Sequence, residues 1–116
     1  MSAGVSTVVY PVRDLAAAKA VFATLLGEPV MDEPYYVGWK ADGQDIGLDP
    51  HGHAQGLTGP VTYWTVDDIE ATTKTLVEAG ATVRQPAKDV GGGKLVAVLA
   101  DADGNPVGLI QPGAWG

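Results

Sequence analysis

The strongest constraint on the fold of this chain is an internal repeat. Two segments rich in β-branched and aromatic residues, 7–15 (TVVYPVRDL) and 61–69 (VTYWTVDDI), align at a constant offset of 54 residues. Two glycine-containing segments, 42–48 (DGQDIGL) and 103–109 (DGNPVGL), align in the same order at an offset of 61 residues. One such match could arise by chance, but two in the same order indicate a tandem duplication. We therefore expect two copies of one structural unit.

The first copy predicts a strand, a helix and three further strands. Asp14 can cap the helix, whose apolar residues recur at helical spacing, and Gly27 ends it. The dipeptide Asp42-Gly43 is typical of a tight hairpin turn between the last two strands. The predicted strands are 5–11, 29–32, 35–41 and 44–49.

The second copy predicts the same order of elements. Its helix begins after Asp67 or Asp68 and ends at Gly80; Asp67 and Glu70 have the spacing of a capping box. The segment 101–105 forms the turn before the last strand. The predicted strands are 60–66, 82–85, 94–100 and 106–111.

A length of 116 residues suits a single domain, 1–116, built from both copies. The first βαβββ module spans 5–50, a connector rich in glycine and small polar residues spans 51–59, and the second module spans 60–112. One such module has too few layers to bury both faces of its sheet, so two are expected to pack together. The predicted fold is α+β, a curved eight-stranded cup with the helices outside.

Alternation along the strands assigns side chains to the two faces of each sheet. The more apolar set of alternating strand residues is expected to face the helices. Its members are Val8, Tyr10, Val12, Ile46, Leu48, Thr62, Trp64, Val66, Val107 and Leu109. Phe22, in the first predicted helix, is expected to face the same core. In the third strand, Tyr35 and Trp39 share the parity assigned to the concave face. The other residues expected on the concave face are Thr7, Val9, Gly47, Val61, Tyr63 and Gly108.

Composition excludes several classes of function. Seven Lys and Arg against fourteen Asp and Glu give a net charge of −7, which opposes binding to a nucleic-acid backbone. The acidic surplus suits a cationic ligand, or serves solubility alone. The absence of cysteine excludes disulfides, thiolate metal sites and cysteine nucleophiles. No apolar run is long enough to cross a membrane and the first residues do not resemble a signal peptide, so we expect a cytoplasmic protein.

Three local motifs admit a binding role beside a structural one. His51 and His53 could bind a metal, or could be solvated side chains of the connector. The segment 101–105 (DADGN) resembles the start of a calcium loop, but its glycine is at the fourth position, which favours a hairpin turn. The segment 91–94 (GGGK) resembles part of a phosphate loop but is followed by Leu95 instead of Ser or Thr, which favours an ordinary loop.

The order and spacing of these segments resemble the vicinal oxygen chelate superfamily, also called the glyoxalase/bleomycin resistance/dioxygenase superfamily. The resemblance extends from Val5 to Pro112 and rests on the duplication together with segments 66–69, 101–105 and 109–112. It implies two βαβββ modules that form a cup, often in a homodimer.

The resemblance also implies where a metal would bind. Enzymes of the superfamily hold a divalent ion with His, Glu or Gln on the first and last strands of each module. The corresponding positions here are Thr7, Gly47, Val61 and Gly108, which include no such ligand. We therefore expect no metal and no cofactor, and we expect the two glycines to leave room for a ligand.

The resemblance and these substitutions together predict a metal-free small-molecule binding protein of the bleomycin-resistance type. Its ligand would be cationic or aromatic, and no catalytic residue is identified. One alternative is a lyase, isomerase or dioxygenase-like enzyme with a non-standard site, for which Asp45 and Asp49 could do acid–base work. Another is a module of a larger protein assembly. The predicted ligand-binding residues are Thr7, Val9, Tyr35, Trp39, Gly47, Asp49, Val61, Tyr63 and Gly108.

Overall fold

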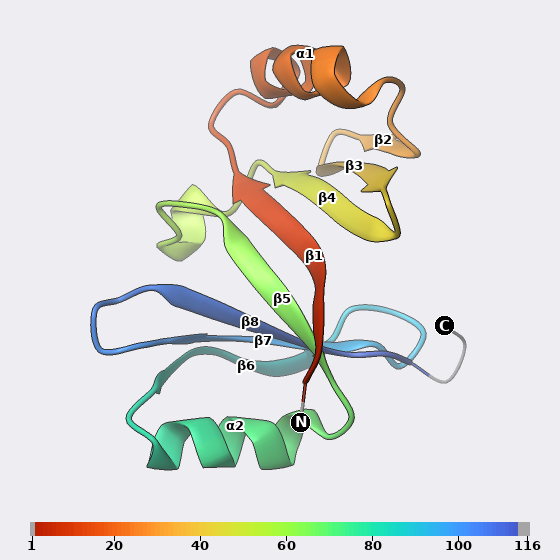
Figure 1. The fold of residues 1–116 in the computed structure, drawn as a ribbon. Coiled ribbons are helices and arrows are strands. Elements are labelled where there is room, and N and C mark those ends of the chain that lie inside the picture. Colours follow the sequence, from red (N-terminus) through yellow and green to blue (C-terminus); the bar gives the residue numbers. More distant parts are fainter. Residues whose placement is uncertain (1, 114–116) are drawn as a thin grey trace. The chain divides into compact units, whose positions relative to one another are not determined.

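The computed structural model describes residues 2–113 and divides into two compact units. One unit is Ser6–Val61, and the other combines residues 2–5 with 62–113. Each unit has four strands and one helix, and the helix lies over one face of its own sheet (Figure 1). The α+β class and the two βαβββ modules expected from the repeat are confirmed. No helix in the described part of the chain is long and apolar enough to cross a membrane.

The first module has the strand order β2-β3-β4-β1. Strand β4 pairs with β1 in parallel and with β3 in antiparallel orientation, and β2 forms the antiparallel edge. β2 starts later than predicted, at Met31, and the Val30 N–H bonds to the carbonyl of Gly38 just before the strand. The elements are β1 (Ser2–Pro11), α1 (Leu15–Leu26), β2 (Met31–Glu33), β3 (Tyr36–Ala41) and β4 (Gln44–Asp49).

The second module repeats this plan with the order β5-β8-β7-β6. Strand β8 pairs with β5 in parallel and with β7 in antiparallel orientation. β6 is longer than predicted, and two register shifts interrupt its pairing with β7 on either side of Gln85. The elements are β5 (Val61–Val66), α2 (Ile69–Glu78), β6 (Thr82–Asp89), β7 (Leu95–Ala100) and β8 (Pro106–Gln111).

Both helices begin at an aspartate that follows the first strand of the module. The Asp14 carboxylate accepts a hydrogen bond from the Ala17 N–H at 2.9 Å, and Asp68 accepts one from the Ala71 N–H at 3.1 Å. Asp68, not Asp67, is therefore the N-cap of α2. Each bond satisfies one of the backbone donors that a helix N-terminus leaves unpaired.

The core of the first module lies between α1 and its sheet. The buried residues at its centre are Val37, Trp39 and Leu48, and Tyr10 and Phe22 pack against them. The indole N–H of Trp39 donates to the carbonyl of Gly27, which ties β3 to the end of α1 at 2.8 Å. Trp39 is therefore an anchor of the helix–sheet interface.

The core of the second module lies between α2 and its sheet, around the buried residues Val66, Ile69, Ala97, Leu99 and Leu109. The side-chain oxygen of Gln111 accepts a hydrogen bond from the Ile69 N–H at 2.8 Å, so β8 also holds the start of α2. Trp64, which alternation assigned to the helix-facing core, is 39% exposed and lies outside this cluster. Helix α2 packs mainly on β6, β7 and β8. On β5, Val66 at the end of the strand belongs to the core beside α2, whereas Trp64 does not.

The turn at Asp42-Gly43 forms the predicted hairpin. Both residues have positive φ, 50° and 79°, as a two-residue turn between antiparallel strands requires. The turn fixes the register of β3 against β4, which pairs Ala41 with Gln44 and Gly38 with Gly47. This register decides which side chains of β3 lie beside Gly47.

Candidate functional site

The face of the first sheet opposite α1 carries several of the predicted ligand-binding residues. In the β1–β4 pairing, Thr7 lies next to Asp45 and Val9 next to Gly47. The alternating residue Leu48 is buried in the core under α1, so Gly47 belongs to the opposite face. Thr7 and Val9 are half-buried. The structure thus brings Thr7, Val9 and Gly47 together on one face.

The ring of Tyr36 covers Gly47. A Cβ atom at Gly47 would lie 1.8 Å from Oη of Tyr36, and one at Gly38 would lie 3.0 Å from Cε2 of the same ring. Gly38 and Gly47 are register partners on β3 and β4, so the ring lies across both glycines. The expectation that Gly47 leaves room for a ligand is therefore wrong, because the tyrosine side chain occupies that space.

Gly108 has a tyrosine partner too. In the parallel β5–β8 pair, Gly108 is the register partner of Tyr63. A Cβ atom at Gly108 would lie 2.6 Å from Cδ1 of Tyr63 and 2.8 Å from the carbonyl oxygen of Thr62. This glycine therefore leaves no open space either, and the corresponding prediction is also wrong. Tyr63 itself is half-buried.

Two aromatic residues predicted for the ligand face of β3 lie elsewhere. Trp39 is 1% exposed and belongs to the core under α1. Tyr35 lies in the turn before β3 and is 57% exposed. Trp39 pairs with Ile46, a residue that also packs under α1, so the helix-facing parity of β3 is the opposite of the predicted one. Tyr36, and neither Tyr35 nor Trp39, therefore lies over Gly47 on this face of the sheet.

Val61 is also buried, with 0% of its surface exposed. A residue that lines an accessible cleft must offer surface to the ligand, so the prediction of Val61 as a lining residue is wrong. Asp49 is half-buried, and its Oδ1 accepts a hydrogen bond from the His51 N–H at 2.8 Å. Its carboxylate thus has a local structural partner in the connector.

A lysine and an aspartate form an ion pair on this face of the first module. Lys40 and Asp45 are register partners on β3 and β4, and Nζ of Lys40 lies 2.8 Å from Oδ1 of Asp45. Both side chains are substantially exposed, so solvent screens the pair and its contribution to stability is small. Tyr36 thus lies on a face that presents an ion pair beside an aromatic ring.

The residues at the four metal-ligand positions do not fit the divalent ion that enzymes of the resembled superfamily hold. Val61 and the two glycines have no donor atom, and the tyrosine rings cover Gly47 and Gly108. Among residues 2–113 no group of three or more His, Asp or Glu side chains is placed to hold an ion.

The motif at 101–105 forms the turn between β7 and β8. The Asp101 carboxylate accepts hydrogen bonds from the backbone N–H groups of Asp103 and Asn105 and from the Asn105 side-chain amide, each at 2.9 Å. These bonds, above all the one from the Asn105 side chain, lower the pKa of Asp101. The carboxylate is thus engaged inside the turn, as the hairpin interpretation expects.

Comparison with known proteins identifies the family. The family model of the Glyoxalase/Bleomycin resistance protein/Dioxygenase superfamily matches residues 4–109. No curated protein matches the chain.

Solved structures share the fold. A member of the same superfamily from Vibrio splendidus 12B01 is 19% identical, with 97% of this chain and 100% of that chain covered and a TM-score of 0.70. Methylmalonyl-CoA epimerase from Mycobacterium tuberculosis is 18% identical, with 98% and 91% covered and a TM-score of 0.70. A Mn(II)-bound glyoxalase from Novosphingobium aromaticivorans is 21% identical, with 96% and 40% covered and a TM-score of 0.69. At these identities the likeness shows the fold alone, whereas the family model covers most of the chain. The chain therefore belongs to the glyoxalase/bleomycin resistance protein/dioxygenase superfamily.

Proposed function

We propose that this chain is a metal-independent binding protein of the bleomycin-resistance type, which sequesters an antibiotic or a related metabolite. The ligand would be planar and aromatic or cationic. Within each module it would bind on the sheet face that carries the tyrosine, Tyr36 in the first module and Tyr63 in the second. As the family resemblance implies, we expect the functional form to be a homodimer.

One observation carries the proposal: each module has a tyrosine ring where a metal ligand would otherwise stand. Tyr36 covers Gly47, and Tyr63 covers Gly108. Aromatic faces favour stacking with planar ligands and attract cations, and the phenol oxygen can orient a polar group. The net charge of −7 supports a cationic ligand through long-range attraction.

A thermal-shift screen tests the proposal. Cationic glycopeptides and planar aromatic antibiotics would be added to the protein in the presence of a chelator. A ligand at about 100 times its Kd adds about 2.7 kcal/mol of stability, enough to raise Tm by roughly 10 °C. No stabilisation by any compound would contradict the proposal, and stabilisation only after a divalent metal is added would contradict metal independence.

Tyrosine variants show whether a hit binds where we propose. Tyr36→Leu and Tyr63→Leu remove the rings, and each shift is measured against the Tm of the ligand-free variant. Tyr35→Leu is the matched control, because Tyr35 is the adjacent residue but lies in an exposed turn. We expect the ligand-induced shift to fall in the first two variants and to persist in the control. Equal shifts in all three would place the ligand elsewhere.

An enzymatic role is the second candidate. It is favoured by the superfamily to which the chain belongs, whose name includes glyoxalases and dioxygenases. In the first module the acid–base candidates would be Asp45, beside Thr7, and Asp49. However, Asp45 pairs with Lys40, and Asp49 accepts from the connector backbone. A lyase or isomerase would thus need a site that differs from the usual metal-bound one.

A further inference from the structure

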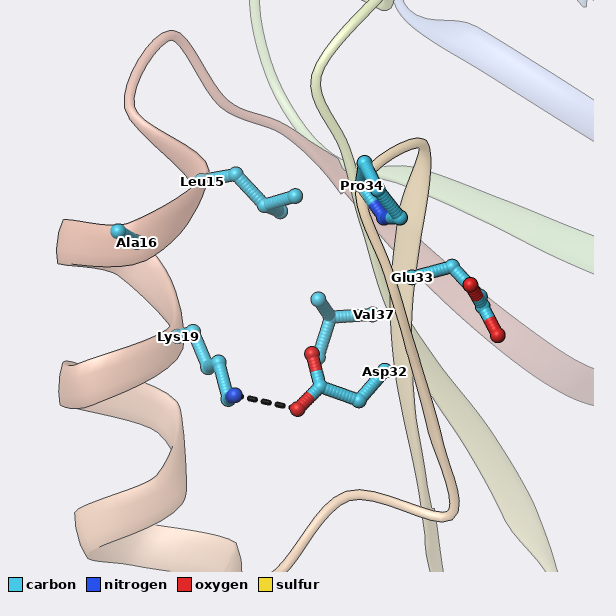
Figure 2. A pocket seen from close by; sticks show the side chains of 7 residues that line it. All are labelled: Leu15, Ala16, Lys19, Asp32, Glu33, Pro34 and Val37. Carbon is cyan, nitrogen blue, oxygen red and sulfur yellow. Dashed lines mark hydrogen bonds and ion pairs between the residues drawn. The ribbon is translucent and has the colours of Figure 1, made fainter.

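A pocket of about 470 Å³ lies in the first module between the start of α1 and the β2–β3 hairpin (Figure 2). Its lining residues are Leu15, Ala16, Lys19, Asp32, Glu33, Pro34 and Val37. The pocket is on the helix side of the sheet, because Val37 belongs to the core under α1 whereas the neighbouring Tyr36 belongs to the opposite face. It is therefore separate from the surface proposed above.

The walls of this pocket are largely apolar. Leu15 and Ala16 come from the first turn of α1, Pro34 from the hairpin turn, and Val37, which is 1% exposed, from β3. Figure 2 shows Leu15, Pro34 and Val37 around the open centre, and the side chain of Glu33 directed away from it. The volume is in the range of small-molecule pockets, about 300–1,000 Å³. An apolar group of a small molecule can bury its surface here.

One side of the pocket is closed by an ion pair between Lys19 of α1 and Asp32 of β2. Figure 2 shows one Asp32 oxygen directed at Lys19 and the other toward the open centre of the pocket. Among the described residues, only the first of these oxygens accepts a hydrogen bond. The Asp32 side chain is 51% exposed, so the second oxygen remains available to a donor from solution.

We propose that this pocket binds a small amphipathic cation, an organic ammonium ion with an aromatic or alkyl group. The apolar group would lie against Leu15, Pro34 and Val37, and the ammonium group would donate to the second carboxylate oxygen of Asp32. A cation is favoured over an anion because the second Asp32 oxygen is directed inward whereas Nζ of Lys19 is directed at Asp32 (Figure 2), and because the lining contains two carboxylates and one ammonium group. The charge of −7 on the whole chain acts in the same direction.

Titration of ¹⁵N-labelled protein with benzylammonium chloride tests this site. Backbone amide shifts in 15–19 and 31–37 are expected to saturate with a Kd of roughly 1–10 mM, as a ligand of this size permits. Benzyl alcohol and benzoate have the same ring without the positive charge, so we expect each to bind at least about fivefold more weakly. No saturable shifts in these segments, or benzoate binding as tightly as benzylammonium, would overturn the proposal.

Two variants locate the cation. Asp32→Asn keeps the shape of the side chain but removes its charge, and we expect a loss of at least about fivefold in affinity. Glu33→Gln is the matched control: it changes the net charge equally on the next residue, and we expect less than about a twofold change. Equal losses of affinity in the two variants would show that the net charge of the chain, and not Asp32 itself, attracts the cation. That result would overturn the assignment to Asp32.

A third variant keeps the test valid if Asp32→Asn disturbs the hairpin. Ala16→Leu enlarges a lining residue at an exposed position of α1 and leaves Lys19 and Asp32 unchanged. A well-dispersed amide spectrum would establish that this variant is folded. We expect it to lose the saturable shifts; unchanged affinity would show that the cation binds outside the pocket.

Discussion

The two modules place a tyrosine over a glycine of the last strand, but they take the tyrosine from different strands. In the first module Tyr36 comes from the antiparallel neighbour β3, and its ring lies across Gly38 and Gly47. In the second module Tyr63 comes from the parallel neighbour β5, directly at the register position of Gly108. The same packing thus arises from two strand pairings. In both modules, therefore, the glycine accommodates a tyrosine ring and does not mark an empty site.

The helices differ more than the sheets. Helix α1 has an apolar outer surface, where Val21 is 68% and Leu25 78% exposed, whereas the outer surface of α2 carries Glu70, Lys74 and Glu78. The hydrogen bonds that attach the helices to their sheets differ as well. The Trp39 indole N–H donates to Gly27 at the end of α1, and the Gln111 side chain accepts from the Ile69 N–H at the start of α2. Duplication has preserved the topology of the modules, and different side chains now stabilise each helix against its sheet.

The largest change in stability is expected for one of the two tryptophans that lie in strands, Trp39, and a much smaller one for the other, Trp64. Trp39→Ala removes a fully buried side chain and its bond to Gly27, so we expect a loss of about 3–5 kcal/mol in the free energy of unfolding. Trp64→Ala, at a position 39% exposed, is expected to cost less than about 1 kcal/mol. Urea denaturation measures both, and equal losses would contradict the assignment of Trp39 to the core.

The next prediction compares the two glycines. In Gly108→Ala the new Cβ would meet both the Tyr63 ring and the backbone carbonyl of Thr62, so we expect a loss of about 2–3 kcal/mol. In Gly47→Ala it would meet only the outer end of the Tyr36 side chain, which can swing away, so we expect about 1 kcal/mol. Urea denaturation again gives the free energies.

A double variant tests the cause of the glycine effect. Adding Tyr36→Ala should relieve the cost of Gly47→Ala but leave the cost of Gly108→Ala unchanged. Independent, additive losses at Gly47 and Tyr36 would show that the ring does not cover this glycine.

The helix caps provide a smaller comparison. We expect Asp14→Ala to cost about 1 kcal/mol, because α1 loses the acceptor for the Ala17 N–H. Asp68→Ala should cost less, since Gln111 still accepts from the Ile69 N–H at the start of α2. Both variants change the net charge equally, so general electrostatic effects cancel. Thermal unfolding measures the difference, and a larger loss in Asp68→Ala would contradict a supporting role for Gln111.

The smallest effect concerns the turns before the last strands. Hydrogen bonds lower the pKa of Asp101, so the stabilisation that they provide is present above the pKa of the unfolded chain and is lost as pH falls through the lowered value. Asn105→Ala should raise the pKa of Asp101 toward its ordinary value, because the largest cause of the shift is the Asn105 side chain. NMR titration of the carboxyl carbon measures this. Asp42→Asn, in the corresponding turn of the first module, is the control that should leave Asp101 unchanged.

The repeat predicted most of the fold because hydrophobic periodicity and capping residues are local signals. Asp14, Gly27 and the Asp42-Gly43 turn lie where the sequence predicted them. Trp64 was assigned to the core because alternation identifies a face but does not reveal how far a helix extends over it. The available pattern could not show that α2 covers β6, β7 and β8.

The site was predicted less well, although one available signal would have corrected it. A two-residue turn at Asp42-Gly43 requires Trp39 to pair with Ile46, which was already assigned to the helix side. The same register places Tyr36 on the face of Gly47. The packing of the ring on the glycines depends on side-chain conformation in three dimensions, so the sequence could not show that the space beside Gly47 is filled.

Tyrosine rings cover Gly47 and Gly108, two of the positions at which enzymes of this superfamily carry metal ligands. Elemental analysis tests this arrangement most directly, on protein purified without chelator, incubated with Zn²⁺, Ni²⁺, Mn²⁺ and Fe²⁺, and then passed through gel filtration. We expect only substoichiometric metal in the protein fractions. A stoichiometric divalent ion retained by the chain, and released when Tyr36 or Tyr63 is replaced by leucine, would contradict this expectation.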